Sequence, residues 1–105
     1  MGLVAYSLLS CSLLYDITYT TASIDITNKT SYSIVGVYVS ADPAQSWGDN
    51  LISSSIVTGG WKTINDIPKS VVSIQAILQD CTVVEKDSVD LTNIEFYKLE
   101  VDSPN

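Results

Sequence analysis

Apolar and polar residues alternate with a period of two through most of this chain. In residues 23–27, Ile24 and Ile26 are separated by polar residues, and residues 72–78 repeat the pattern. A period of two is typical of strands that bury one face. Residues 32–40 are instead apolar on both faces and rich in β-branched and aromatic side chains, which predicts a central strand.

Turn-forming residues divide the rest of the chain into short segments. Asn28-Lys29-Thr30-Ser31 and Thr58-Gly59-Gly60 are turn signals, and residues 66–69, which include Pro68, are expected to break the chain. Further strands are expected at residues 54–57, 61–64, 82–85, 88–91 and 94–101. About seven short strands with no helical period predict an all-β fold, a two-sheet antiparallel β-sandwich.

The domain boundaries follow from length and composition. A chain of 105 residues has room for one hydrophobic core. We assign the β-sandwich to residues 23–101 and a polar tail to residues 102–105. Residues 1–22 carry one charged side chain, Asp16, and their apolar run has the length of a signal-peptide hydrophobic region rather than of a membrane-spanning helix.

The N-terminal segment also contains a candidate lipidation site. Leu8-Leu9-Ser10-Cys11 resembles a bacterial lipobox, in which the cysteine is lipidated and becomes the new N-terminus. A lipoprotein signal opens with Lys or Arg, and none precedes Lys29. The alternative is that residues 1–22 form an apolar N-terminal strand. The lipobox resemblance implies an extracytoplasmic protein, secreted or lipid-anchored at the bacterial envelope.

The two cysteines permit one disulfide, between Cys11 and Cys81, and no cysteine-rich metal site. Lipidation of Cys11 would leave Cys81 without that partner. We expect Cys81 to be a small buried hydrophobic residue, which is the common role of a lone thiol.

Charge and composition narrow the classes of function. Twelve acidic residues against five lysines, with no arginine, give a net charge of -7. Such a surface repels nucleic-acid phosphates and anionic lipids, so we expect no nucleic-acid partner and membrane contact only through a lipid anchor. The chain has no histidine, which removes the usual general base and the commonest transition-metal ligand. We therefore expect no enzyme activity, while calcium binding through oxygen ligands stays open.

An ordered set of short motifs extends from Ile24 to Leu99. The motifs are Asn28-Lys29-Thr30, the strand Ile34 to Ser40, Ser46-Trp47-Gly48-Asp49-Asn50-Leu51, Thr58-Gly59-Gly60, the alternating run Val72 to Leu78, and Val89-Asp90-Leu91. In this order they resemble a widespread, functionally uncharacterised family of small bacterial secreted and lipoprotein domains. The resemblance implies a β-sandwich and an extracytoplasmic location, and it brings no activity with it.

The stretch after the long strand admits two interpretations. Pro43 cannot continue a strand ladder, so the chain must leave the sheet there. In the first interpretation Trp47 folds back over the end of the sandwich with its ring buried, while Asp49 and Asn50 cap nearby backbone N–H groups.

In the second interpretation the same stretch binds calcium. Residues 49–54, with Asp49-Asn50 at the start and Ser53-Ser54 at the end, resemble the calcium loop of microbial βγ-crystallins. The resemblance implies Asp49, Asn50 and either Ser53 or Ser54 as ligands, with Asp42 as a neighbour. A second such loop and the aromatic corners of that family are absent from the sequence. No other cofactor is expected.

Aromatic residues supply the remaining candidate site. Trp47, Trp61 and Tyr38 would suit a carbohydrate platform if they lay together, because aromatic faces stack on sugar rings, although core packing is the commoner use. We conclude from the sequence that the chain is a non-catalytic extracytoplasmic binding or structural module, with an envelope protein or a glycan as partner. The alternatives are a calcium-stabilised β-domain and a carbohydrate-binding module.

Overall fold

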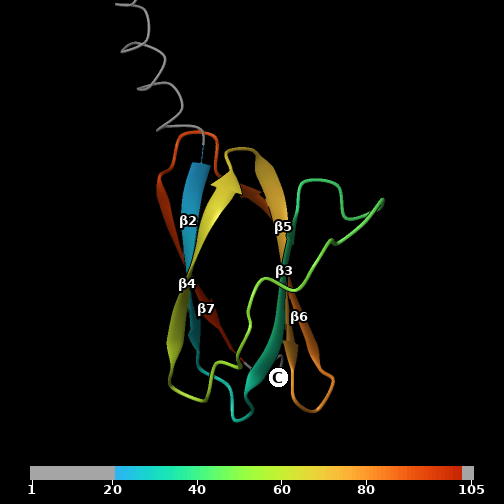
Figure 1. The fold of residues 1–105 in the computed structure, drawn as a ribbon, viewed down its shortest axis with the longest axis vertical. Coiled ribbons are helices and arrows are strands. Elements are labelled where there is room, and N and C mark those ends of the chain that lie inside the picture. Colours follow the sequence, from blue (N-terminus) through green and yellow to red (C-terminus); the bar gives the residue numbers. More distant parts are fainter. Residues whose placement is uncertain (1–20, 103–105) are drawn as a thin grey trace, which may run out of the picture.

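The computed structural model describes residues 21–102. In that part of the chain there are six strands and no helix, and therefore no helix that could cross a membrane (Figure 1). The strands are β2 (Thr21–Asn28), β3 (Ile34–Ser40), β4 (Trp61–Pro68), β5 (Val71–Leu78), β6 (Val83–Asp90) and β7 (Phe96–Val101). The predicted N-terminal segment with its lipidation site Cys11, apart from its last two residues, and the end of the predicted tail lie outside the described residues.

The six strands form two sheets of three. Their orders are β4-β2-β7 and β3-β5-β6, and Figure 1 shows the strands of the first sheet on one side of the view and those of the second on the other. Three of the four strand pairs are antiparallel, but β2 and β7 are parallel, so the prediction of a purely antiparallel arrangement is wrong. The connection after β6 crosses to the other sheet and brings Glu95 beside the start of β2, where its carbonyl accepts a hydrogen bond from the Ser23 N–H (3.0 Å). The chain therefore enters β7 in the same direction as β2.

Both sheets contribute to a single cluster of buried side chains. β2 gives Ile24 and Ile26, both fully buried, and β3 and β5 give Val37 and Ile74. The alternating burial along β2 confirms the period of two in the sequence. Each such aliphatic side chain stabilises the fold by about 1.5–3 kcal/mol relative to an exposed one. The cluster holds the two sheets together.

One predicted strand is absent, and the predicted end of β4 is wrong. The segment 54–57 is not a strand, since its pairing is one isolated bridge between Ile56 and Ile34. β4 does not end before residue 66 but continues to Pro68. It is the outer strand of its sheet, where a proline can sit without removing an interior ladder bond. Asp66, with φ of 63°, takes up the register shift that the pairing with β2 shows in this region.

The segments 82–85 and 88–91, predicted as two strands, form the single strand β6. Ser88 has a φ of 57° and lies at an irregularity in the pairing with β5, as expected of a β-bulge. This merger, with the loss of the segment 54–57, reduces the predicted strand count to six within residues 21–102.

Cys81 is exposed, so the prediction that it is a buried hydrophobic residue is wrong. It occupies the tight turn between β5 and β6 with a φ of 73°. The Cys81 N–H donates to the Leu78 carbonyl (2.9 Å), and the carboxylate of Asp80 accepts from the Thr82 N–H (3.0 Å). Turn chemistry therefore places this side chain in solvent, whatever its hydrophobicity.

Candidate functional site

The connection from residue 41 to residue 60 runs beside both sheets and contains or adjoins most of the predicted site residues. It begins with a turn in which the Asp42 carbonyl accepts from the N–H groups of Gln45 and Ser46 (3.0 and 3.1 Å). The Ser40 hydroxyl donates to the Ser46 carbonyl (2.7 Å). The chain thus leaves β3 just before Pro43, as the sequence predicts.

Asn50 fastens this connection to the outer edge of β3. Its side-chain oxygen accepts from the N–H groups of Val37 (2.9 Å) and Ile52 (3.2 Å), and its amide donates to the Val35 carbonyl (3.1 Å). The Leu51 N–H adds a bond to the Val37 carbonyl (2.8 Å). Asn50 therefore imitates a paired strand, which extends its expected role as a backbone cap.

Gly36, next to this contact, makes room for the ring of Tyr38. A Cβ atom at this position would lie 3.1 Å from the Tyr38 ring and 3.6 Å from the Asn50 amide nitrogen. Tyr38 lies two residues along β3 and its ring covers the glycine. The predicted ligand residue Tyr38 thus belongs to the same local packing as Asn50.

The predicted calcium ligands are exposed residues of the connection. Asp42, Asp49, Asn50 and Ser53 are all exposed, and the side-chain oxygen of Asn50 already accepts two hydrogen bonds. Within residues 21–102 no three acidic or cysteine side chains gather closely enough to hold a metal ion. A calcium ion at this place would have to compete with backbone N–H groups for the Asn50 oxygen.

Trp47 is half-buried and does not belong to the buried cluster or to the partly buried residues packed against it. The expectation of a buried ring is therefore met only in part. Gly48, next in the chain, has a positive φ of 75°, and its N–H donates to the Ser46 hydroxyl (3.0 Å).

A buried polar cluster joins the end of β2 to Tyr32 and to the segment 54–57. Asn28 is fully buried, and its amide donates to the carbonyls of Tyr32 (2.8 Å) and Ile56 (2.9 Å). Its side-chain oxygen accepts from the N–H and the hydroxyl of Thr30 (2.9 and 2.8 Å). The turn motif of the sequence is thus a set of satisfied buried hydrogen bonds, which are costly to break.

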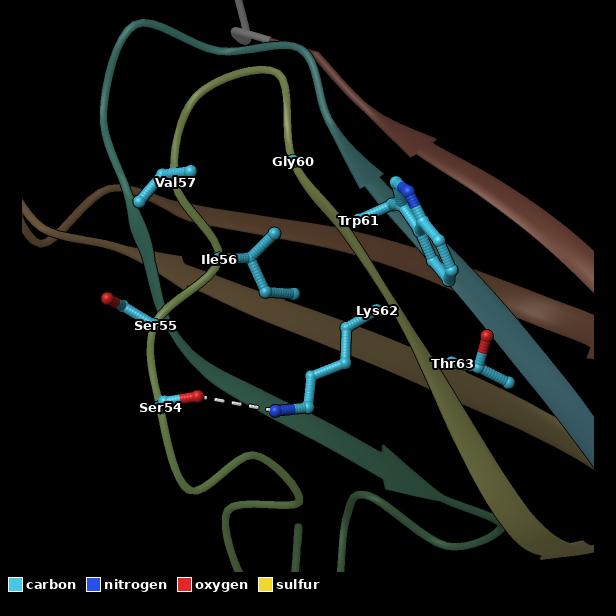
Figure 2. A pocket seen from close by; sticks show the side chains of 8 residues that line it. All are labelled: Ser54, Ser55, Ile56, Val57, Gly60, Trp61, Lys62 and Thr63. Atoms are coloured by element: carbon cyan, nitrogen blue, oxygen red, sulfur yellow. Dashed lines mark hydrogen bonds between the residues drawn. The ribbon is translucent and has the colours of Figure 1, made fainter.

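A hollow of 360 Å³ separates the segment 54–57 from the first residues of β4. Figure 2 shows Lys62 reaching across it from β4, and its ammonium donates to the Ser54 hydroxyl at 3.4 Å. The lining residues are Ser54, Ser55, Ile56, Val57, Gly60, Trp61, Lys62 and Thr63. This volume is within the range of small-ligand pockets.

Trp61 is the most exposed of the large hydrophobic side chains in residues 21–102, at 68 %. Its partner in β2 is Thr27, which alternates with the buried Ile26 and Asn28, so the indole is on the outer face of the sheet. Figure 2 shows the ring on the opposite side of β4 from Lys62. An exposed indole beside a hollow that holds a lysine and two serines is the feature most typical of a binding site here.

The three predicted aromatic ligand residues come from different parts of the fold. Trp61 is in β4, Tyr38 is in β3 of the other sheet, and Trp47 is in the connection between them. Sequence reasoning missed Lys62 and Ser55 and considered Ser54 only as a calcium ligand, because the proximity of these residues depends on how far the segment 54–57 separates from β4. The only signal was a lysine within a predicted strand beside a tryptophan.

The acidic residues of β6 form a charged outer edge on the second sheet. Hydrogen bonding with the Asp87 carboxyl, followed by burial and charge repulsion, raises the pKa of Glu85 above its ordinary value. At the end of the strand, hydrogen bonds from the Thr92 hydroxyl and N–H lower the pKa of Asp90. Glu85 and Asp87 are both exposed.

Comparison of the chain with protein-family models, with curated proteins and with solved structures found no match. The resemblance to a family of secreted bacterial domains therefore stays a prediction from sequence motifs.

Proposed function

We propose that this chain is a β-sandwich that acts outside the cytoplasm as a non-catalytic binding module, with its binding surface at Trp61 and the adjoining hollow. The observation that carries the proposal is the exposure of the Trp61 indole, 68 %, next to a hollow of 360 Å³. A large aromatic side chain left in water costs free energy, and such a residue is favoured where a ligand covers it.

Other features support the architecture and the absence of catalysis. One cluster of buried side chains drawn from both sheets favours face-to-face packing. The chain lacks histidine, and the polar groups at the hollow are hydroxyls and a lysine without a neighbouring acid–base pair. The apolar N-terminal sequence and its lipobox-like motif favour export.

Carbohydrate is a second candidate ligand, favoured by one observation. The outer face beside Trp61 is polar: the Thr63 hydroxyl donates to the Asp25 carboxylate (3.3 Å), and the Ser23 hydroxyl donates to the Asn65 side-chain oxygen (2.8 Å). An indole next to hydroxyl and carboxylate groups suits a sugar ring, which offers an apolar face and many hydroxyls.

The proposal is tested by binding screens on the wild-type protein and on Trp61→Ala. The probes are a panel of soluble polysaccharides and a library of random peptides displayed on phage. Phe96→Ala is the matched control, because Phe96 is an exposed aromatic residue (51 %) on the other outer strand of the same sheet. Binding that Trp61→Ala weakens at least tenfold and Phe96→Ala preserves supports the proposal. Equal binding by all three proteins, or none by any, contradicts it.

A further inference from the structure

The backbone around the hollow carries hydrogen-bonding groups that the strand ladder does not use. The Asn28 N–H donates to the Gly60 carbonyl (2.9 Å) and the Asn28 carbonyl accepts from the Gly59 N–H (2.8 Å), so Asn28 is a hydrogen-bonded position at the end of the β2–β4 ladder, opposite these two glycines. In an antiparallel ladder hydrogen-bonded pairs alternate with non-hydrogen-bonded pairs. The pairs Thr27–Trp61 and Asp25–Thr63 are therefore both non-hydrogen-bonded pairs. The N–H and C=O groups of Trp61 and Thr63 therefore point away from β2, toward the hollow.

The opposite wall of the hollow shows the same arrangement. Ile56 exchanges two backbone hydrogen bonds with Ile34 of β3, both 2.9 Å long. Because successive residues of an extended chain turn their backbone groups to opposite sides, the N–H and C=O of Ser55 point the other way, toward β4. Within residues 21–102 no backbone hydrogen bond joins Ser55 to Trp61 or Thr63.

A tight turn joins the two walls, yet they diverge from it. The Gly60 N–H donates to the Val57 carbonyl (2.8 Å), and Gly59 has a φ of 82°. The segment 54–57 then pairs with β3 of one sheet, while β4 pairs with β2 of the other. The result is an opened hairpin with unpaired backbone groups on both inner edges.

We infer that the opened hairpin binds an extended peptide of another protein. The peptide pairs as a strand with the edge of β4 from Trp61 to Thr63 and lies between that edge and the segment 54–57. This inference rests on the proposed binding surface at Trp61 and names its ligand class. Donors and acceptors that recur at every second residue match a polypeptide strand, because an extended chain repeats its own groups at that spacing.

Lys62 specifies a feature of that peptide. No carboxylate of residues 21–102 lies within ion-pair distance of Lys62, since the ion pair in this part of the chain joins Lys29 and Glu100 (3.7 Å). Its ammonium reaches into the hollow toward Ser54. An acidic side chain of the peptide, placed opposite Lys62, would supply the missing charge.

A second copy of the chain is a poorer occupant of this edge. Each copy carries a net charge of -7, which opposes self-association. A symmetric pairing of two β4 strands in which residue 61 faces residue 63 of the partner also places Lys62 opposite Lys62. Like charges directly opposite each other destabilise a strand pair. A peptide of a different protein avoids both the repulsion between two acidic copies and the facing pair of lysines.

The test uses a synthetic nine-residue peptide of alternating threonine and valine with one central glutamate. Its binding is followed by the fluorescence of Trp61 in the full chain carrying Trp47→Phe. The inference expects saturable binding that N-methylation of alternate peptide bonds weakens at least tenfold. It also expects that Thr63→Pro weakens binding tenfold, because proline lacks the N–H that the peptide would pair with. The same substitution leaves the β2–β4 hydrogen bonds in place.

Charge reversal gives the decisive arm. A peptide with lysine in place of glutamate should bind the parent chain at least fivefold more weakly, and Lys62→Glu should restore its binding. Lys98→Glu is the matched control, since Lys98 is an exposed lysine on β7, and it should restore nothing.

Three results would overturn the inference. The first is binding that depends on Trp61 but survives both N-methylation and Thr63→Pro, which keeps the binding surface and removes strand pairing. The second is a dimer in sedimentation that Thr63→Pro dissociates, which makes a second copy the occupant. The third is no saturable binding of the unmodified peptide, and if the polysaccharide and phage screens are negative as well, the proposed function fails with it.

Discussion

The outer edges of β3 and β4 both face the connection between these strands, but within residues 21–102 the connection hydrogen-bonds to the backbone of β3 and not to that of β4. β3 is covered in its first half: Asn50, Leu51 and Ile56 hydrogen-bond to the backbone of Ile34, Val35 and Val37. β4 is left open from Trp61 to Thr63, and the hollow lies where a neighbouring strand would be. Unpaired edges favour aggregation, so proteins usually cover them or charge them. The open edge of β4, beside the exposed Trp61, is therefore the place where a peptide strand can pair with this sheet.

β6 shows the other way of protecting an edge. It presents Glu85, Lys86 and Asp87 to solvent and contains the bulge at Ser88. Charges and bulges both discourage the approach of another strand. In the open part of β4 the only charged residue is Lys62. The contrast between β4 and its counterparts in the other sheet is what the following substitutions test.

The largest effect is expected from Asn28→Ala. This substitution leaves the buried Thr30 N–H without its partner and removes the amide donor from the carbonyls of Tyr32 and Ile56. An orphaned buried group costs about 1–3 kcal/mol and each further lost bond about 0.5–1.5 kcal/mol, so we expect a loss of about 3 kcal/mol or more. Urea unfolding measures it. A loss below about 0.5 kcal/mol would show that Asn28 does not hold the segment 54–57 to the end of β2.

Two separate proline substitutions test which backbone groups of β4 face the open edge. Lys62→Pro removes an N–H from the β2–β4 ladder and should cost about 2 kcal/mol or more. Thr63→Pro removes an N–H that points to the hollow and should cost less than about 1 kcal/mol. Thermal unfolding of both variants decides the order. The reverse order would place the open groups at Lys62 instead.

Asn50→Ala should uncover the edge of β3. Losing the carboxamide removes three hydrogen bonds, and because the site is exposed we expect a loss of about 1–2 kcal/mol. Asn50→Asp separates this role from a calcium site. It removes the donor to Val35 and should also destabilise the protein, by a similar amount in EDTA and in millimolar calcium. A variant that calcium stabilises by several degrees would favour the metal interpretation.

Trp61→Thr should change the stability of the isolated protein by no more than about 0.5 kcal/mol, since the indole is mostly in water. Chemical denaturation checks this value, with Ile64→Thr as a control that removes a buried side chain of the same strand. A loss comparable to that of the control would make Trp61 a packing residue and not a ligand contact.

The smallest effect concerns the charged edge of β6. Because the pKa of Glu85 is raised in the folded state, its protonated form stabilises the protein below the ordinary value of 4.5. That contribution is lost as the pH rises through the raised pKa. Relative to wild type, Glu85→Gln should therefore gain melting temperature between pH 4 and pH 7. An unchanged difference over this range would contradict the pairing of Glu85 with Asp87.

The sequence predicted the parts of the fold that depend on local pattern. The alternation at Ile24 and Ile26 located β2, and the residues Thr58-Gly59-Gly60 located a tight turn, although the strand expected before that turn is absent. It could not show that the chain enters β7 parallel to β2, because that depends on where the crossing after β6 ends. For the same reason it could not show that Ile56 pairs with β3 rather than with β4, and the hollow follows from that choice.

The side chains of the candidate site were predictable by type and not by position. Trp61 was chosen as an aromatic contact and is exposed, whereas Tyr38 packs over Gly36. Asn50 was expected either to cap backbone groups or to bind calcium, and its bonds to β3 fit the first interpretation. A side chain's partners at a separation of thirteen or fifteen residues are set by the path of the loop, which local sequence does not encode.

The parallel pairing of β2 with β7 has a mechanical consequence. Ser23 lies beside Phe96 at one end of the pair, and Asn28 lies beside Val101 at the other. Tension applied at the start of β2 and the end of β7 would slide the two strands past each other, loading all of their hydrogen bonds at once rather than one after another. We expect the domain to resist stretching more strongly along this direction than when it is pulled through β3 and β6. Single-molecule force measurements on the two geometries would show the difference.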